Sequence, residues 1–403
     1  MNFEEWKEKR LGEVAKITKL SGFEFTKCFN YVDDGDIIAI RALNVKNGTL
    51  DLTDVKRITS STSCGLTRSK LYKNDIVLTY TGAKFGEVAI IKYNNKFHLA
   101  PNVAKATPLE NICYPYYLYC FMRSDNFHTQ LINYSVGSSQ PTIPMNIIRQ
   151  LSVLLPPLSE QKTIAATLSC LDDKIELNNR MNRTLEEMAQ AIFKSWFVDF
   201  EQFQNGEFVD SELGPIPKGW RVGTLGECIE LFDSQRVPLS SRQREKMKKI
   251  YPYYGATSIM DYVDNYLFDG MYVLLGEDGS VVDDNGYPIL QYVWGKFWVN
   301  NHAHILKGKS GFNEDSLYML LRNTNVRGAV TGAVQLKINQ ANLKALKVLI
   351  PSAVDLEKYN SLLEPIFAFR RSCSEETQKL ILTRDSLLPK LMSGEIRVPL
   401  EVK

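Results

Sequence analysis

Residues 159–198 read SEQKTIAATLSCLDDKIELNNRMNRTLEEMAQAIFKSWFV, and this stretch decides how the chain is organised. From Ile164 to Trp196 a seam of mostly apolar residues recurs in alternating steps of four and three, a heptad pattern with a period of about 3.5 residues. Ser159 is a good N-cap, because its hydroxyl can accept a hydrogen bond from the first turn. The pattern predicts one uninterrupted helix from Glu160 to about Val198, roughly 58 Å long at ~1.5 Å per residue.

A second seam of the same period runs through residues 356–391 and stops at Ser393-Gly394, where glycine is a natural C-cap. Two such helices most simply pack on each other, and they must be antiparallel if the flanking domains lie at opposite ends. The alternative is that each helix lies on its own domain as a surface helix. Both seams turn polar near the middle, at Asn178 and Asn182 in the first and at Arg370 and Thr377 in the second, and polar seam residues usually fix the register. The residues that we expect in the coiled coil or in contact with partner subunits are Leu168, Leu171, Ile175, Asn178, Asn182, Leu185, Ile192, Trp196, Leu363, Ile366, Leu380 and Leu387.

The rest of the chain repeats itself around these helices. Trp6-x4-Leu11-Gly12-Glu13 recurs as Trp220-x4-Leu225-Gly226-Glu227, and the segment 137–143 recurs as 332–338. Asn102-Val103-Ala104 is loosely echoed by Asn301-His302-Ala303. The sequence therefore consists of two copies of a unit about 200 residues long.

Each copy begins with short β-type runs separated by glycines, such as 76–80 and 272–275, and includes short helical stretches such as 115–122. We predict an α+β fold in which two repeated, mixed, β-rich domains are separated by two long helices that form an antiparallel coiled coil. The predicted limits are a first domain at 1–155, a central helix at 156–200, a Gly/Pro-containing linker at 201–219, a second domain at 220–352 and a C-terminal helix at 353–395.

The composition excludes several classes of protein. The 403 residues are 44% hydrophobic and 23% charged, as in a soluble globular protein, and no apolar run approaches the ~18–20 residues that span a membrane. The N-terminus lacks an apolar signal core, and the seven cysteines contain no CxxC pair, so we expect a cytoplasmic protein with reduced thiols. Residues 1–155 contain 19 basic and 14 acidic residues, a small surplus that gives slight support to an anionic partner such as DNA.

The motifs of several enzyme classes are missing. The sequence has no GxxxxGK[ST] loop, no GxGxxG after a strand, no Asp/Asn-Pro-Pro-aromatic motif and no Pro-Asp pair. His302 and His304 would share a strand face but lack an evident third metal ligand, so packing or surface roles are preferred. Acidic residues in the loops 276–279 and 283–286 are explained by turn chemistry, with a metal site as the alternative. We therefore predict no catalytic residue, no metal-binding residue and no enzyme activity.

Two domains held apart by long helices suit a DNA duplex, because two modules on one face can recognise half-sites about 34–36 Å apart, one helical turn. Arginine can bind guanine, glutamine can bind adenine, and lysine neutralises phosphate. Gln140 and Gln335 occupy matching places and are either DNA contacts or turn-fixing groups, and the basic run 242–249 is either a DNA contact or a solvated helix face. The candidate DNA-binding residues are Arg41, Lys46, Arg68, Lys70, Tyr80, Thr81, Lys84, Gln140, Arg236, Ser240, Arg242, Arg244, Lys248 and Gln335.

Five features together resemble the DNA-specificity subunit of type I restriction-modification systems. They are Leu155-Pro156-Pro157-Leu158-Ser159-Glu160-Gln161 with the helix that follows, the run 184–197, the repeated Trp-x4-Leu-Gly-Glu motif, Gly214-Pro215-Ile216-Pro217-Lys218-Gly219-Trp220, and the ending 387–396. The resemblance covers essentially the whole chain. It implies that each domain is a target recognition domain for one half of a bipartite site in double-stranded DNA. It also implies that the two helices set the gap between the half-sites and dock methyltransferase (modification) subunits.

The same resemblance places the chemistry in other subunits. It implies that the modification subunits bind S-adenosylmethionine and methylate adenine at N6, that restriction subunits use ATP with Mg, and that this chain binds no cofactor. In the second copy, residues 350–357 depart from the Pro-Pro-Leu-Ser-Glu-Gln pattern, so we expect the second helix to start or dock differently. Two alternatives stay open: a standalone two-domain DNA-binding or anti-restriction protein, and a duplicated coiled-coil scaffold that binds no DNA.

Overall fold

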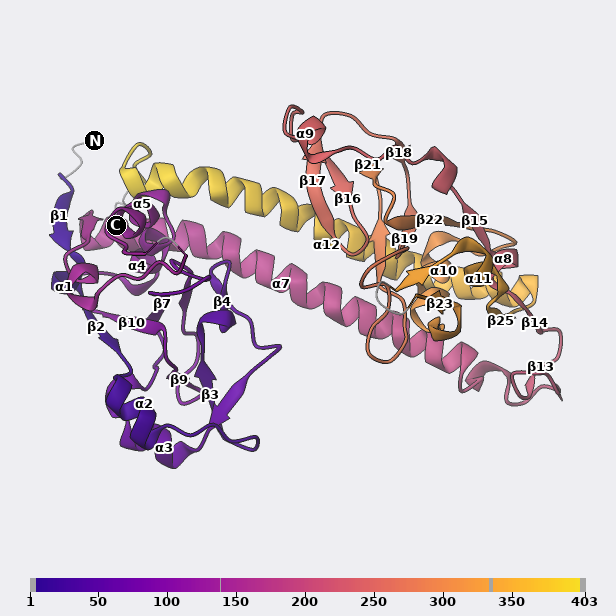
Figure 1. The fold of residues 1–403 in the computed structure, drawn as a ribbon, viewed down its shortest axis with the longest axis horizontal. Helices are drawn as coiled ribbons and strands as arrows, with labels where there is room; N and C mark the ends of the chain where they lie inside the picture. Colours follow the sequence, from indigo (N-terminus) through magenta and orange to yellow (C-terminus); the bar gives the residue numbers. More distant parts are fainter. Residues whose placement is uncertain (1–4, 138, 333–335, 399–403) are drawn as a thin grey trace. The chain divides into compact units, whose positions relative to one another are not determined.

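The computed structural model describes residues 5–137, 139–332 and 336–398. The chain divides into two compact units: unit 1 comprises residues 1–177 and 376–403, and unit 2 comprises residues 178–375. The division passes through two long helices, α7 (Leu158–Phe197) and α12 (Ala353–Ser393), so each unit contains part of both (Figure 1). Both helices confirm the heptad prediction, and α12 ends directly before Gly394, whose φ of 76° is the left-handed conformation of a C-cap.

Each unit is built on the same four-stranded antiparallel sheet. The strand order is β2-β10-β7-β8 in unit 1 and β15-β22-β19-β20 in unit 2. The strands are β2 (Ala15–Lys19), β10 (Val103–Pro108), β7 (Ile76–Thr79) and β8 (Val88–Ile90), matched by β15 (Ile229–Leu231), β22 (Ala303–Gly308), β19 (Tyr272–Gly276) and β20 (Leu290–Val293). This repeated topology confirms the internal duplication that the sequence predicts.

The strand register corrects one detail of that duplication. Val103 pairs with Thr79 in unit 1, and Ala303 pairs with Gly276 in unit 2. The Asn102 carbonyl accepts the N–H of Tyr80, the residue after β7, and the His302 carbonyl accepts the N–H of Glu277, the residue after β19. These bonds align Asn102 with His302. The predicted match of Asn102 with Asn301 is therefore wrong by one residue, because hydrogen bonding and not residue identity sets the register.

Smaller sheets complete each unit, and each unit has one sheet with a parallel pair, β3 with β9 and β16 with β21. In unit 1 these strands are β1 (Lys7–Arg10), β11 (Ser152–Leu155), β3 (Ile37–Ile40), β6 (Lys56–Ile58), β9 (Phe97–Leu99), β4 (Val45–Lys46) and β5 (Thr49–Leu50). In unit 2 they are β14 (Arg221–Thr224), β25 (Lys347–Ile350), β16 (Tyr251–Tyr254), β17 (Ile259–Val263), β18 (Phe268–Asp269), β21 (Lys296–Val299), β12 (Phe208–Val209), β13 (Ile216–Pro217), β23 (Val330–Thr331) and β24 (Lys337–Ile338).

Short helices cover the sheets. They are α1 (Leu11–Val14), α2 (Gly22–Cys28), α3 (Ser60–Gly65), α4 (Pro115–Met122), α5 (Asp125–Asn133) and α6 (Met145–Ile148) in unit 1, and α8 (Leu225–Cys228), α9 (Ser241–Arg244), α10 (Glu314–Arg322) and α11 (Gln340–Ala345) in unit 2. Short 3-10 turns lie at Ala42–Asn44, Thr67–Ser69, Glu201–Phe203, Asp233–Gln235 and Arg327–Ala329. Within the described residues, every helix is too short or too polar to cross a bilayer.

The repeated tryptophan motif ties each domain to the first turn of a long helix. The indole N–H of Trp6 donates to the Glu160 carboxylate at 3.1 Å, and that of Trp220 donates to Asp355 at 3.0 Å. Asp355 is also capped by Ser352, whose hydroxyl accepts its backbone N–H at 3.2 Å. The second helix thus shares the tryptophan–acid bond of the first, and its Ser-x-x-Asp sequence supplies both a cap and the acid. Its first turn is otherwise held differently, as expected: Gln161 of α7 binds the Tyr114 N–H and the Pro156 carbonyl, whereas Leu356 of α12 packs in the apolar core.

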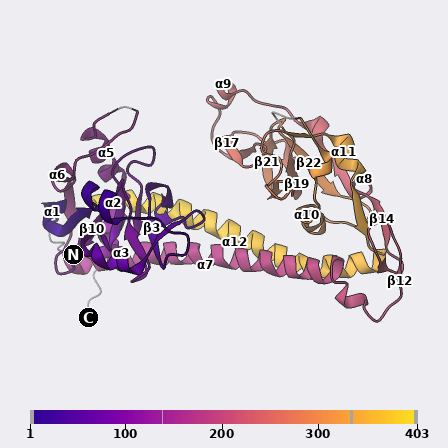
Figure 2. The ribbon, with the colours of Figure 1, turned by 60° about the horizontal axis from the view of Figure 1, so that its bottom comes forward.

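Within each unit, the parts of α7 and α12 lie side by side in both views (Figures 1 and 2) and run antiparallel. In unit 1 Asp172 pairs with Arg384 at 2.8 Å and Lys174 with Glu376 at 3.0 Å, so the numbers rise on one helix as they fall on the other. All twelve predicted seam residues are buried or half-buried. The helices also pack on the domain cores, so the two packing alternatives occur together.

Polar contacts fill the middle of the seam in unit 2. The Asn182 side-chain amide donates to the Ser374 hydroxyl at 3.0 Å, and that of Asn178 donates to the Cys373 carbonyl at 3.4 Å. Arg370 forms an ion pair with Glu186 at 3.2 Å. These directional contacts can be satisfied at one alignment of the helices only, as polar seam residues generally require.

Candidate nucleic-acid interface

A pair of hydrogen-bonded loops marks the same end of the main sheet in both units. In unit 1 the loop that follows β7 is bonded to the segment 136–143: the Ile143 N–H donates to the Tyr80 carbonyl at 3.1 Å, and the Gly82 N–H donates to the Pro141 carbonyl at 3.1 Å. The hydroxyls of Thr81 and Thr142 are also hydrogen-bonded to each other. We call this arrangement the paired loops of unit 1.

Unit 2 reproduces the arrangement with different side chains. The Ile338 N–H donates to the Glu277 carbonyl at 2.9 Å, and the Gly279 N–H donates to the Leu336 carbonyl at 3.0 Å. Gly82 and Gly279 have φ values of 89° and 87°, a left-handed conformation that glycine adopts without strain. The ends of the two repeated segments, residues 141–143 and 336–338, therefore hold the loops that follow β7 and β19.

The paired loops of unit 1 bring together four of the predicted DNA-binding residues. Lys84 and Gln140 are exposed, whereas Tyr80 and Thr81 are half-buried. Lys19 adds a second cation, since its ammonium lies 4.9 Å from the centre of the Tyr80 ring. The matching glutamine of the second copy, Gln335, lies outside the described residues.

The other predicted residues of unit 1 lie elsewhere. Arg68 and Lys70 are near the opposite end of β7, where Arg68 forms an ion pair with Glu24 at 3.2 Å. Arg41 is largely buried and pairs with Asp54 at 3.1 Å. Lys46 is exposed at the end of β4. Unit 1 therefore has one clustered set at the paired loops and several separate cations.

In unit 2 the structure divides the predicted basic segment into inward and outward residues. The Arg236 side chain is 14% exposed, donates to the Ala303 carbonyl at 2.8 Å and pairs with Glu277 at 2.6 Å. Arg244, 12% exposed, pairs with Asp261 at 3.1 Å. Both guanidiniums are thus held by internal partners, so Arg236 and Arg244 are not free cations at this surface.

Ser240, Arg242 and Lys248 remain at the surface. The Ser240 hydroxyl caps α9 by accepting the Gln243 N–H at 3.3 Å. Within the described part of the chain, the Arg242 side chain has no hydrogen-bond or ion-pair partner. Of the predicted DNA-binding residues in this segment, Arg242 and Lys248 are thus the cations placed to meet an external anion, and Lys246 between them is exposed as well.

A buried polar network supports the paired loops of unit 2. The His304 ring contacts the Asp233 carboxylate at 2.6 Å through Nδ1 and the Ile338 carbonyl at 2.8 Å through Nε2. Since both partners are acceptors, both ring nitrogens must carry protons. Burial alone would lower the pKa of His304, but these two hydrogen bonds together with the negative charges of Asp233 and Glu277 outweigh burial, and the pKa is raised.

The same network answers the question of a metal site. Asp233, Glu277 and His304 place three potential ligand atoms within 4.8 Å of one another. However, Glu277 is already paired with Arg236 at 2.6 Å and with Lys337 at 3.2 Å. Protein cations occupy the places that a metal would need, so these residues do not fit a metal ion.

A second network, which the sequence analysis missed, anchors unit 1 to its helices. Asp172 on α7 accepts hydrogen bonds from Arg384 at 2.8 Å, from the Tyr116 hydroxyl at 2.6 Å and from Arg123 at 3.4 Å. Arg123 also donates to the Tyr119 hydroxyl at 3.0 Å. Asp172 therefore ties α4 to both long helices at a single carboxylate.

Comparison with known proteins agrees with this architecture. A family model described as a type I restriction modification DNA specificity domain matches residues 3–187 and residues 217–367. The chain is 26% identical over 421 residues to the type I restriction enzyme MjaIX specificity subunit of Methanocaldococcus jannaschii, covering 97% of this chain and 93% of that protein. It is 28% identical over 201 residues to the type I restriction enzyme HindI specificity subunit of Haemophilus influenzae, covering 49% of this chain and 42% of that protein.

The fold has a solved counterpart. The crystal structure of a type I restriction-modification S subunit from M. genitalium superposes with a TM-score of 0.61 at 15% identity, over 97% of this chain and 96% of that one. Two specificity-domain matches in one chain define a two-domain DNA-recognition protein. The chain belongs to the DNA specificity subunits of type I restriction-modification systems. It is a non-catalytic recognition subunit, and catalysis lies in other subunits.

Proposed function

We propose that unit 1 and unit 2 each bind one half of a bipartite site in double-stranded DNA. The observation that carries this proposal is the duplication of the paired loops on the same sheet in both units. Each unit offers exposed polar or basic groups, Lys84 and Gln140 at the paired loops of unit 1 and Arg242 and Lys248 in and after α9 of unit 2. Lysine and arginine supply the phosphate contacts that position a protein on DNA, and glutamine can distinguish adenine.

The chain then directs chemistry that other subunits perform. Methyltransferase subunits with S-adenosylmethionine methylate adenine at N6, and ATP-dependent restriction subunits use ATP with Mg. Family membership and the missing catalytic motifs support this division of labour. The chain acts in the cytoplasm, where it meets chromosomal DNA.

The direct test is a genome-wide map of N6-methyladenine in cells that express the modification subunit with and without this chain. We expect a motif of two short half-sites around a fixed gap to be methylated only when the chain is present. If no methylation depends on the chain although the modification subunit is soluble, the result favours the two alternatives, a standalone DNA-binding protein or a scaffold that binds no DNA. DNA affinity of the purified chain then separates those two, because a scaffold would lack salt-dependent binding.

Single substitutions sharpen this test. Gln140→Ala should broaden the methylated motif within one half-site if the amide contacts a base. If it only fixes the turn, the motif is unchanged and thermal stability falls. Arg242→Gln should weaken DNA binding and reduce its salt dependence, since each phosphate contact contributes about 0.9 to the slope of log affinity against log salt. Lys7→Gln, an exposed lysine on β1, is the matched control.

A further inference from the structure

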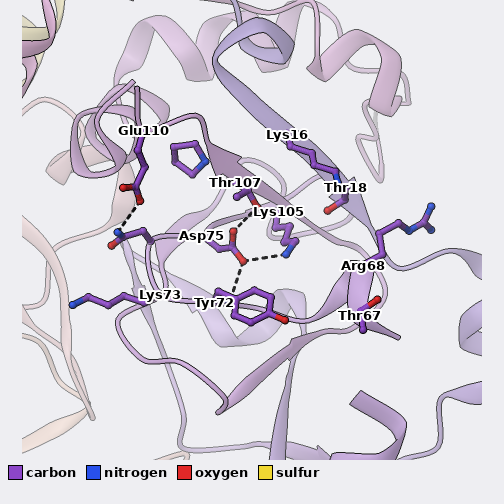
Figure 3. A pocket seen from close by; sticks show the side chains of 12 residues that line it. Lys16, Thr18, Thr67, Arg68, Tyr72, Lys73, Asp75, Lys105, Thr107 and Glu110 are labelled. Carbon is purple, nitrogen blue, oxygen red and sulfur yellow. Dashed lines mark hydrogen bonds and ion pairs between the residues drawn. The ribbon is translucent and has the colours of Figure 1, made fainter. Parts of the chain in front are cut away.

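A polar cavity of about 410 Å³ lies in unit 1 between β2, β10 and the segment 67–75 (Figure 3). Lys16 and Thr18 of β2 lie on one face of the sheet with Lys105 and Thr107 of β10, because Lys105 is paired with Thr18 and Thr107 with Lys16. Arg68 borders the cavity on another side. Side chains from separate segments thus converge on one space.

The lining is cationic. Four basic residues face two acidic ones, Asp75 and Glu110. Asp75 is already satisfied, since its carboxylate accepts hydrogen bonds from the Lys105 ammonium at 3.1 Å and the Tyr72 N–H at 2.9 Å. Glu110 accepts from the Asn74 amide at 3.2 Å. Arg68 is paired with Glu24, outside the lining, at 3.2 Å. The lining therefore keeps a small net positive charge, carried by Lys16 and Lys73 against Glu110.

Two groups of the lining have unused hydrogen-bonding capacity. The Thr18 hydroxyl oxygen is buried and has no hydrogen-bond partner among the described residues. Lys16 is exposed and is likewise without an ion-pair partner in the described part of the chain. A buried hydroxyl without a partner costs stability, so a ligand that accepts its hydrogen bond would remove that cost.

The second copy of the fold provides an internal control. The register places Phe232, Tyr272 and Ile305 of unit 2 where unit 1 has Thr18, Asp75 and Lys105. These three side chains belong to one apolar cluster with Phe268 and Phe297. The fold therefore does not require polar groups here.

The comparison also argues against stability as the main reason for the polar lining. The side chains of Lys105 and Asp75 are 8% and 2% exposed. A buried ion pair gives little or no net stability compared with well-packed apolar residues of similar volume. Unit 2 fills this place with apolar side chains and unit 1 with polar ones. We take this difference to indicate that the polar groups of unit 1 serve to bind a ligand.

We propose that this cavity binds a phosphate group that is part of a larger molecule, with Lys16 and the Thr18 hydroxyl as its main contacts. Phosphate supplies the negative charge and the several acceptor oxygens that the lining calls for. The cavity has room for more than ten waters at about 30 Å³ each, far more than one phosphate fills. The phosphate comes either from the DNA backbone or from a free phosphorylated molecule. The site does not depend on the proposed recognition of half-sites.

The experiment uses the full chain and two probes, inorganic phosphate and duplex DNA. Lys16→Gln/Thr18→Val removes one charge and one hydroxyl, and Lys7→Gln/Ser152→Ala removes the same two groups from the β1–β11 pair outside the cavity. Thermal unfolding is measured in phosphate and in chloride at equal ionic strength. General stabilisation by phosphate acts on all proteins alike, so only the difference between variants counts. If the double variant does not fold, the single variant Thr18→Val replaces it in the experiment, because valine has nearly the same shape as threonine.

We expect phosphate to raise the unfolding temperature of the wild type and the control more than that of Lys16→Gln/Thr18→Val. If the cavity variant also lowers DNA affinity several-fold and reduces the salt slope by about 1, the phosphate is that of DNA. If DNA binding is unchanged, the ligand is a free phosphorylated molecule. Equal responses of all proteins to both probes would overturn the proposal. A chain that binds no DNA refutes the proposed function, while the phosphate measurement still decides the cavity.

Discussion

Asp172→Asn offers the sharpest test of how unit 1 is held to its helices. The side chains of Asp172, Arg384 and Arg123 are only 19%, 15% and 14% exposed, so the carboxylate balances two largely buried guanidiniums. Asparagine keeps the size and one acceptor oxygen but removes the charge. A hydrogen bond to a charged group contributes about 1.5–3 kcal/mol, and breaking a fully buried pair costs about 3–5 kcal/mol. Partial exposure places the expected loss at about 2–3 kcal/mol of unfolding free energy.

Thermal and urea unfolding followed by far-UV circular dichroism measures this loss. For a domain of this size about 1 kcal/mol shifts the midpoint by roughly 2–4 °C, so we expect a decrease of roughly 5–10 °C. Lys92→Gln, which removes the exposed ion pair with Glu176, should leave the midpoint unchanged. A double-mutant cycle with Arg384→Gln isolates the pair. A loss below about 0.5 kcal/mol for Asp172→Asn, the range of ordinary surface substitutions, would refute the reasoning.

Three further predictions concern single contacts. The pKa of His304 in the folded chain is raised above its ordinary 6.5, so the ion pair of His304 stabilises the fold fully below pH 6.5 and this stabilisation is lost as the pH rises through the folded pKa. Unfolding midpoints measured against pH should show this decline in the wild type but not in His304→Gln. Gly82→Ala meets open space but keeps a φ of 89°, so urea unfolding should show a loss of about 1–2 kcal/mol from backbone strain alone. Trp220→Phe removes the hydrogen bond to Asp355 and keeps an aromatic ring, so thermal unfolding should show a loss of about 1.5–3 kcal/mol.

The features that the sequence predicted correctly are local or periodic. The seam repeats from Ile164 to Trp196 within the 40 residues of α7, and no other secondary structure matches that period. The tryptophan motif recurs with its spacing intact, so the duplication could be recognised without any three-dimensional contact. The four-stranded sheet order, in contrast, follows from pairings between distant segments that the residue pattern does not specify.

The candidate site was harder to predict, because its chemistry depends on distant partners. Arg236 looks like a free surface cation in the sequence, yet Glu277, 41 residues away, holds it inward. Arg242, in the same basic segment, stays exposed. A side chain's charge can be read from the sequence, but whether an acid satisfies that charge depends on the folded register. One signal was available: Lys105 lies between Ala104 and Ala106 in a mostly apolar strand, where a lysine needs a buried partner.

The duplication allows fold-determining and function-determining residues to be separated within one chain. Contacts present in both units at the same register, such as the bonds from Trp6 and Trp220 to an acid on a long helix, are requirements of the shared fold. Positions that differ between the units are free of that requirement. The exchange of a buried Lys105 for Ile305 on matching strands is such a difference, and it changes charge, volume and hydrogen bonding together. These non-equivalent positions are where substitutions can change binding while the fold is retained.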